Sequence, residues 1–390
     1  MNDEATDEAT GGVSNGVTVP GAGWHRAGGE DLTRPKGRRR RKGGGGWGSG
    51  NREAAMVPEA EFTSYYGRPI VKPATWKNPE VPLYLFLGGV GGTSAVIGAL
   101  GEFTGRPQLT RTAHFTAAGG ALASVVLLIV DLGRPMRFLH MLRVFKPTSP
   151  LSVGSYILSP FSALTVATAG LHALPWFPAV RALKVARWIP GLRKSAAVGA
   201  AVFGGPMTTY TAVLLANTAS PSWHEPHDEL PFLFAGSALA AGGGITMALT
   251  PVAEAGPSRK VAVVGAAIEL AAAHKVENGH GVVSEPYHIG RAGKLLRAAK
   301  ACTVGGAGLT VLAGKTRAGA IVGGALLAAG SALTRFGVFD AGMASAKDPK
   351  YTVIPQRARL AARQAEAAER AAAGEAPVPA PDGQARSVTR

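Results

Sequence analysis

The sequence has almost no cysteine, since Cys302 is the single one in 390 residues. One thiol cannot form a disulfide within the chain, hold an iron–sulfur cluster through several thiolates or build a cysteine-rich zinc site. We therefore expect that any electrons reaching this chain are carried to it by other subunits.

Charge is also scarce. Asp, Glu, Lys and Arg make up 17% of the residues, against roughly 25% in soluble domains. The charges are clustered, which leaves long neutral stretches rich in Gly and Ala, as in membrane helices whose backbones approach through small residues. The net charge of +16 does not indicate nucleic-acid binding, because the basic residues are not interleaved with aromatic side chains that could stack on bases.

Eight long apolar stretches are present in the sequence. Five of them have 18 to 24 residues, enough to cross about 30 Å of hydrocarbon: 81–103, 113–130, 152–174, 195–218 and 230–253. The other three are 261–274, 301–314 and 318–339. Helices that are apolar all round leave no polar face for water, which excludes a soluble helical protein. The sequence therefore predicts an all-α integral membrane protein with about eight transmembrane helices.

The remaining segments divide the chain into three parts. Residues 1–64 are rich in Gly, Pro and basic side chains and are expected to be disordered. The transmembrane domain covers 65–345, and 346–390 should form a polar helix followed by a disordered tail.

Eight spans place both termini on one side, together with the longer loops. The positive-inside rule favours a plasma (inner) membrane protein with cytoplasmic termini. On the other side, 175–194 has the composition of an interfacial segment.

Ionisable residues within or near the apolar stretches are candidates for proton transfer, because a charge buried without a partner is costly. Glu269 lies midway along its stretch, where it suits a proton relay or an ion pair with Arg335. Glu102 and Asp131 lie at the ends of theirs. We predict Glu102, Asp131 and Glu269 as proton-relay residues.

Histidines do not indicate a bound metal. His114 and His172 each lie at the end of a stretch with no second pair, so a haem held by two histidines is not expected. His224 and His227 lie in one loop without a recurrent ligand spacing and are expected to be solvated. We predict no haem, no iron–sulfur cluster and no metal site. Tyr210 is of more interest, because a buried phenol needs a hydrogen-bond partner, which is either a neighbouring helix or a ligand such as a quinone carbonyl.

Several motifs, in order along the chain, resemble NrfD-like proteins, the polysulfide-reductase-type membrane subunits. The motifs are Tyr66-Gly67-Arg68-Pro69-Ile70-Val71-Lys72-Pro73, the loop that begins Asp131-Leu132-Gly133-Arg134-Pro135 and ends Lys146-Pro147-Thr148-Ser149-Pro150, and Tyr210-Thr211-Ala212-Val213-Leu214-Leu215. Ala212 stands where the family commonly has Gly. The resemblance covers about 65–345.

The resemblance implies an NrfD-like bundle that binds menaquinone or another quinone and is not catalytic alone. It would dock a ferredoxin-like iron–sulfur subunit, which in turn contacts a molybdopterin catalytic subunit. The positions that match the family's quinone site are Tyr210 and, nearby, Tyr84, and we add His114. The Asn and His that the family's better-known polysulfide reductases carry on the first helix are absent between 81 and 100.

Basic residues of the loop after the second stretch suit the docking of an acidic partner. We predict that docking involves Arg134, Arg137, Arg143 and Lys146. Two alternatives stay open: a structural anchor without a quinone site, and an unrelated transporter or proton channel. The latter predicts an inverted repeat, which the sequence does not show convincingly.

Overall fold

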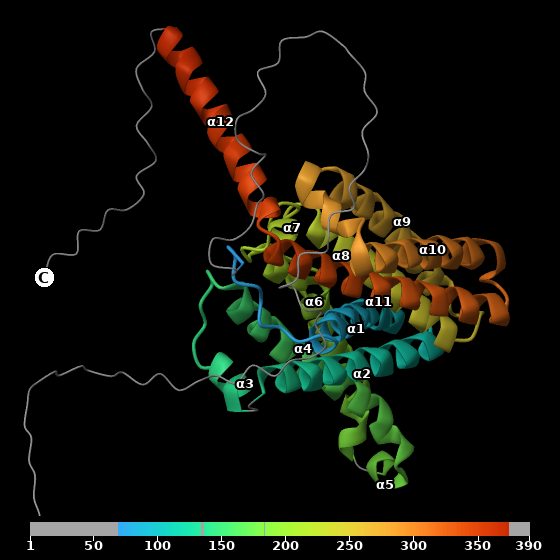
Figure 1. The fold of residues 1–390 in the computed structure, drawn as a ribbon. Coiled ribbons are helices and arrows are strands. Elements are labelled where there is room, and N and C mark those ends of the chain that lie inside the picture. Colours follow the sequence, from blue (N-terminus) through green and yellow to red (C-terminus); the bar gives the residue numbers. More distant parts are fainter. Residues whose placement is uncertain (1–68, 134–135, 183, 374–390) are drawn as a thin grey trace, which may run out of the picture. The chain divides into compact units, whose positions relative to one another are not determined.

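The structure is a computed structural model that describes residues 69–373, apart from 134, 135 and 183. Over these residues every regular element is a helix, and no strand is present (Figure 1). The tails predicted to be disordered, at 1–64 and after the C-terminal helix, lie outside the described residues, as does the predicted docking residue Arg134.

Eight long helices form the described transmembrane part of the chain. They are α1 (Glu80–Phe103), α2 (Pro107–Leu132), α4 (Pro150–Ala173), α6 (Ile189–Ala216), α8 (Leu230–Leu249), α9 (Gly256–Asn278), α10 (Gly290–Ala313) and α11 (Arg317–Lys347). Among the described helices, seven are long and apolar enough to cross a membrane. The prediction of an all-α membrane protein is confirmed.

Helix α9 is the one of the eight that does not meet this criterion. The apolar stretch expected at 261–274 is shorter than the helix that contains it. Charged side chains extend the helix at both ends, with Arg259 and Lys260 at one end and Lys275 and Glu277 at the other. These residues lower the mean hydropathy of α9 without preventing the helix from packing in the bundle.

The helices pack as two four-helix bundles. One contains α1, α2, α4 and α6, and the other contains α8, α9, α10 and α11, with α10 and α11 side by side (Figure 1). Helix α1 also packs against α8 and α11. In its apolar segment 72% of the residues are buried, against 28% in α2, so α1 lies at the centre and α2 turns most of its surface toward lipid.

Glycine allows the close contact between α1 and α6. A Cβ atom at Gly92 would lie 2.5 Å from the carbonyl oxygen of Gly204, and one at Gly88 would lie 2.6 Å from Cε of Met207. Larger residues at these positions would force the two helices apart. This packing sets the spacing between α1 and α6 in the first bundle.

The bundle has two distinct ends, because successive long helices alternate in direction. The loop-rich face carries residues 69–79 and 136–149, which include the short helix α3 (Met136–Met141), and the short elements α7 (Pro221–His224) and η3 (Gly281–Tyr287). The polar helix α12 (Lys350–Ala372) also begins there. The opposite face carries the short connections and the segment 174–188, which folds into η1 (Leu174–Trp176), α5 (Pro178–Arg181) and η2 (Lys184–Trp188).

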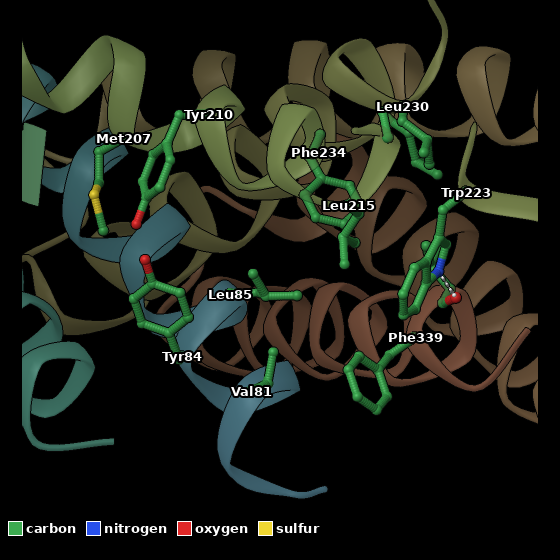
Figure 2. Close-up of a cluster of buried hydrophobic side chains, with 14 of the residues drawn as sticks. Val81, Tyr84, Leu85, Met207, Tyr210, Leu215, Trp223, Leu230, Phe234 and Phe339 are labelled. Atoms are coloured by element: carbon green, nitrogen blue, oxygen red, sulfur yellow. Dashed lines mark hydrogen bonds between the residues drawn. The ribbon is translucent and has the colours of Figure 1, made fainter. Parts of the chain in front are cut away.

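Trp223 organises the loop-rich face. Its indole Nε1 donates a hydrogen bond to the carbonyl oxygen of Val338 (2.7 Å) (Figure 2). Its ring centroid lies 5.7 Å from those of Trp76 and Phe339. A Cβ atom at Gly342 would overlap this indole, so glycine is needed there. The segment before α1 is therefore held against α7 and α11.

At the same face, Tyr287 joins η3 to α7. Its hydroxyl donates a hydrogen bond to the backbone carbonyl of Ser222. Burial raises the pKa of the Tyr287 phenol far above its ordinary value, so the phenol remains protonated and keeps donating.

Candidate functional site

A pocket opens between α1, α2, α4 and α6 at the loop-rich face. Most of its lining side chains are apolar. The polar groups come from Tyr84 on α1, Asp131 on α2, Ser155 on α4 and Tyr210 on α6, and Trp76 contributes from the segment before α1. An apolar pocket with a few convergent polar groups is typical of a small-molecule site.

The two tyrosines face each other across this pocket. Figure 2 shows Tyr84 and Tyr210 with their hydroxyl ends directed toward one another. The Tyr210 hydroxyl is buried and makes no hydrogen bond to any residue that the structure describes. A buried hydroxyl without a partner costs roughly 1–3 kcal/mol, which points to a ligand as the missing partner.

Gly154 on α4 creates the space for the Tyr210 ring. A Cβ atom at this position would overlap the edge of the ring, at Cε2 and Cδ2. The ring therefore lies directly against the α4 backbone. Any larger residue at 154 would displace the phenol from its place in the pocket.

Asp131 lies in the last turn of α2 and is half-buried. The helix ends after it because Gly133 adopts a left-handed conformation, with φ of 70°, which favours glycine. The Asp131 carboxylate accepts a hydrogen bond from the backbone N–H of Lys77 (3.1 Å). It is thus fixed at the edge of the pocket and is the acidic group that lines it.

His114 and Glu102 were predicted for quinone binding and proton transfer, and the structure places both at the other end of the first bundle. On α1, Glu102 lies eighteen residues after Tyr84, which corresponds to about 27 Å along a helix. His114, near the start of α2, is 2% exposed. Neither residue lines the tyrosine pocket.

These two residues belong instead to a second polar site, the opposite-face cluster of Glu102, His114, His172 and Arg193. Arg193 donates two hydrogen bonds to the Glu102 carboxylate, from Nε (2.6 Å) and from Nη2 (3.0 Å). The nearer Glu102 oxygen lies 3.9 Å from Nδ1 of His114 and 3.7 Å from Nε2 of His172. The two imidazole rings are 4.9 Å apart, measured between centroids.

Glu269 is buried inside the second bundle, at 2% exposure. Its carboxylate accepts hydrogen bonds from the hydroxyls of Thr334 (2.8 Å) and Thr303 (3.4 Å). The expected ion pair with Arg335 is not among the contacts of the described residues. Arg335 instead donates to the carbonyl oxygen of Phe234 (2.8 Å) and lies over its ring.

Glu269 also lines a narrow gap together with Glu277 and Lys300, which form an ion pair. Glu277 is near the end of α9 at the loop-rich face, and Lys300 is half exposed.

The predicted docking residues that the structure describes are exposed. Arg137 is on α3, and Arg143 and Lys146 are in the loop that follows. Side chains of α4 hold this loop in place: Tyr156 donates to the carbonyl oxygen of Leu142 (2.8 Å), and the Ser152 hydroxyl accepts from the backbone N–H of Lys146 (3.0 Å). The three cations thus lie on an ordered loop beside the pocket.

Sequence reasoning did not assign roles to Gly154, to Arg193 or to the pairing of His172 with Glu102. A signal for the cluster was present, because Glu102 ends one apolar stretch, His114 begins the next and His172 ends the third. Successive antiparallel helices bring these ends to the same face. The loop histidine His227 is exposed, as expected.

Comparison with known families gives one match. The model of the NrfD-type family described as polysulfide reductase matches residues 62–347. No curated protein shows significant similarity to the chain. The matched region contains both bundles, the tyrosine pocket and the basic loop. Because it covers most of the chain, the protein belongs to the NrfD-type polysulfide reductase family of membrane subunits.

Proposed function

We propose that this protein is the quinone-reactive membrane subunit of a molybdopterin oxidoreductase complex. It binds menaquinone or a related quinone in the tyrosine pocket and exchanges electrons with a ferredoxin-like iron–sulfur subunit. The observation that carries the proposal is the buried Tyr210 hydroxyl, which has no partner among the described residues and faces an apolar pocket.

The residues of the pocket fit a quinone headgroup. A quinone supplies two-electron redox chemistry, and its reduction takes up two protons. The Tyr210 hydroxyl donates to one carbonyl oxygen, and the Tyr84 hydroxyl lies on the facing helix to contact the same headgroup. The apolar side chains of α1, α2 and α4 that line the pocket would contact the quinone ring.

Asp131 is the proton donor or acceptor of this arrangement. A general acid or base must lie within hydrogen-bond reach of the reacting group, directly or through one water, and Asp131 is the carboxylate that lines the pocket. Its contact with the Lys77 backbone leaves one oxygen for this role. Glu269 and Glu102 lie elsewhere, so they would act on protons only at a distance from the headgroup.

The partner subunit docks at the loop-rich face. Arg137, Arg143 and Lys146 present positive charge on the loop that directly follows Asp131. Such charge steers an acidic electron-transfer protein to the surface and fixes its orientation. Docking there brings an iron–sulfur cluster to the same end of the membrane as the quinone. We place this face and both termini in the cytoplasm, and a reporter fused to the C-terminus tests the orientation.

The test is purification of the tagged protein in mild detergent, with quinone extraction and iron analysis on the same sample. We expect about one menaquinone per chain and iron from a companion subunit. The variant Tyr210→Phe should lose quinone affinity. The matched control Tyr351→Phe removes a hydroxyl from α12, outside the lining of the pocket, and should bind normally.

The other outcomes separate the alternatives. Iron without quinone, in a preparation that also fails to bind added quinone, would indicate a structural anchor. A folded preparation with neither iron nor quinone, even under gentler conditions, would contradict the assignment to an electron-transfer complex and favour a transporter.

A further inference from the structure

The opposite-face cluster has the composition of a metal site. Two imidazoles and one carboxylate come from three different helices: Glu102 from α1, His114 from α2 and His172 from α4. One ligand atom from each lies within 4.8 Å of the others. Three protein ligands with a vacant fourth position is a common arrangement around zinc and related cations.

The imidazole nitrogens lack the partners that buried polar atoms normally have. Both ring nitrogens of His114 and Nε2 of His172 are buried and make no hydrogen bond within the described part of the chain. His114 is 2% exposed, so solvent does not satisfy it. Nδ1 of His114 and Nε2 of His172 lie 3.9 Å and 3.7 Å from the same Glu102 oxygen, which indicates that a ligand binds between the two rings and the carboxylate.

We propose that Glu102, His114 and His172 bind a divalent transition-metal cation of the Zn²⁺ type. Imidazole ligands select zinc, copper, iron or nickel, whereas magnesium and calcium prefer oxygen ligands. Metal–nitrogen bonds of about 2.0–2.1 Å place tetrahedral ligand atoms about 3.3 Å apart. The cluster closes to this geometry with side-chain shifts on the order of 1 Å.

Neighbouring residues support the site. Arg193 holds the Glu102 carboxylate with two hydrogen bonds, and a carboxylate oxygen that accepts such a bond keeps a second lone pair for a metal. Ligands are commonly oriented by outer contacts of this kind. Gly98 leaves room for the His114 ring, because a Cβ atom there would lie 2.7 Å from its Nε2.

The fourth coordination position is reached from solvent. A surface pocket is lined by Glu102 and His172 and by basic side chains that include Arg106, Arg111 and Lys194. These cations disfavour a bare dication and favour one that carries an anion such as chloride or hydroxide. The bound cation joins α1, α2 and α4 at the end of the bundle far from the tyrosine pocket.

The test is a Zn²⁺ titration of the full chain, purified with a tag free of histidine, against a competing chelator. We expect one Zn²⁺ per chain, no competition by Mg²⁺, and a melting temperature raised by roughly 5 °C when free Zn²⁺ is 100 times the Kd. His114→Gln and His172→Gln should each weaken binding at least tenfold. The control His227→Gln alters an exposed histidine at the loop-rich face and should not change the affinity.

A measurement that needs no variant completes the test. X-ray absorption of the zinc-loaded protein should show two imidazole ligands and additional oxygen or chloride. The proposal is overturned if no Zn²⁺ binds, if both cluster variants bind as tightly as the unmodified chain, or if His227→Gln abolishes binding instead.

Discussion

Replacing Tyr210 by phenylalanine separates a ligand-binding phenol from a structural one. The Tyr210 hydroxyl is buried without a hydrogen bond to any described residue, so its removal breaks no contact in the quinone-free protein. It also removes a buried polar atom that costs roughly 1–3 kcal/mol when unsatisfied. We therefore expect Tyr210→Phe to leave the free energy of unfolding unchanged or raise it by up to about 1 kcal/mol.

The Tyr210→Phe variant should bind quinone more weakly than the unmodified chain. One lost hydrogen bond between the phenol and a quinone carbonyl is worth about 0.5–1.5 kcal/mol, which raises Kd roughly 2- to 12-fold. Measured hydrogen bonds between membrane helices average about 0.6 kcal/mol, so the lower half of this range is expected. The assay is a menaquinone titration in detergent, paired with thermal melting of the same preparation.

Tyr287 provides the matched comparison. Its hydroxyl donates to the buried carbonyl of Ser222, so Tyr287→Phe leaves that acceptor without its phenol donor and should destabilise the protein by about 1–3 kcal/mol. The reasoning is refuted if Tyr210→Phe lowers the melting temperature as much as Tyr287→Phe does. It is also refuted if Tyr210→Phe leaves the menaquinone Kd unchanged.

Three further predictions concern other parts of the molecule. Gly342→Ala places a Cβ atom within the Trp223 indole and should destabilise the protein by about 1–3 kcal/mol, measured by thermal melting; an unchanged melting temperature would show that α11 can shift. Arg143→Glu should weaken the iron–sulfur partner's association, and the difference from the unmodified chain should shrink as salt is added; equal association rates at low salt would exclude this loop from docking. Glu269→Gln should keep menaquinone affinity unchanged because Glu269 does not line the tyrosine pocket, and an altered Kd would show that the two bundles are coupled.

The helices could be predicted from the sequence because their signal is local. Uncharged runs of about 20 residues have few structural solutions in a membrane, and alternation of direction then fixes which ends meet. The same reasoning brings Tyr84, Asp131 and Tyr210 to one end of the first bundle, although it does not show that they share a pocket. That depends on Gly154 and on the fold of residues 69–79, which carry no periodic pattern.

Other features depended on contacts that sequence spacing does not encode. Arg335 was a reasonable partner for Glu269, since both lie deep in the second bundle. In the structure two threonines bind the carboxylate, and the guanidinium satisfies the Phe234 carbonyl. Which of several nearby acceptors a long side chain reaches depends on rotamers and helix rotation, so the residue types alone could not decide it.

If the protein has the proposed function, Asp131 lies between the pocket that binds the quinone and the loop that docks the partner. Asp131 lines the pocket from the last turn of α2. The exposed Arg137 follows it six residues later in the sequence. Arg137 in turn donates to the carbonyl oxygen of Leu132 (3.2 Å), the residue directly after Asp131. A partner that draws the Arg137 guanidinium into an ion pair would release this contact and loosen the last turn of α2. Partner binding would thereby change the environment of the carboxylate to which we assign proton exchange with the quinone, so electron delivery and proton delivery would be coupled through the end of α2.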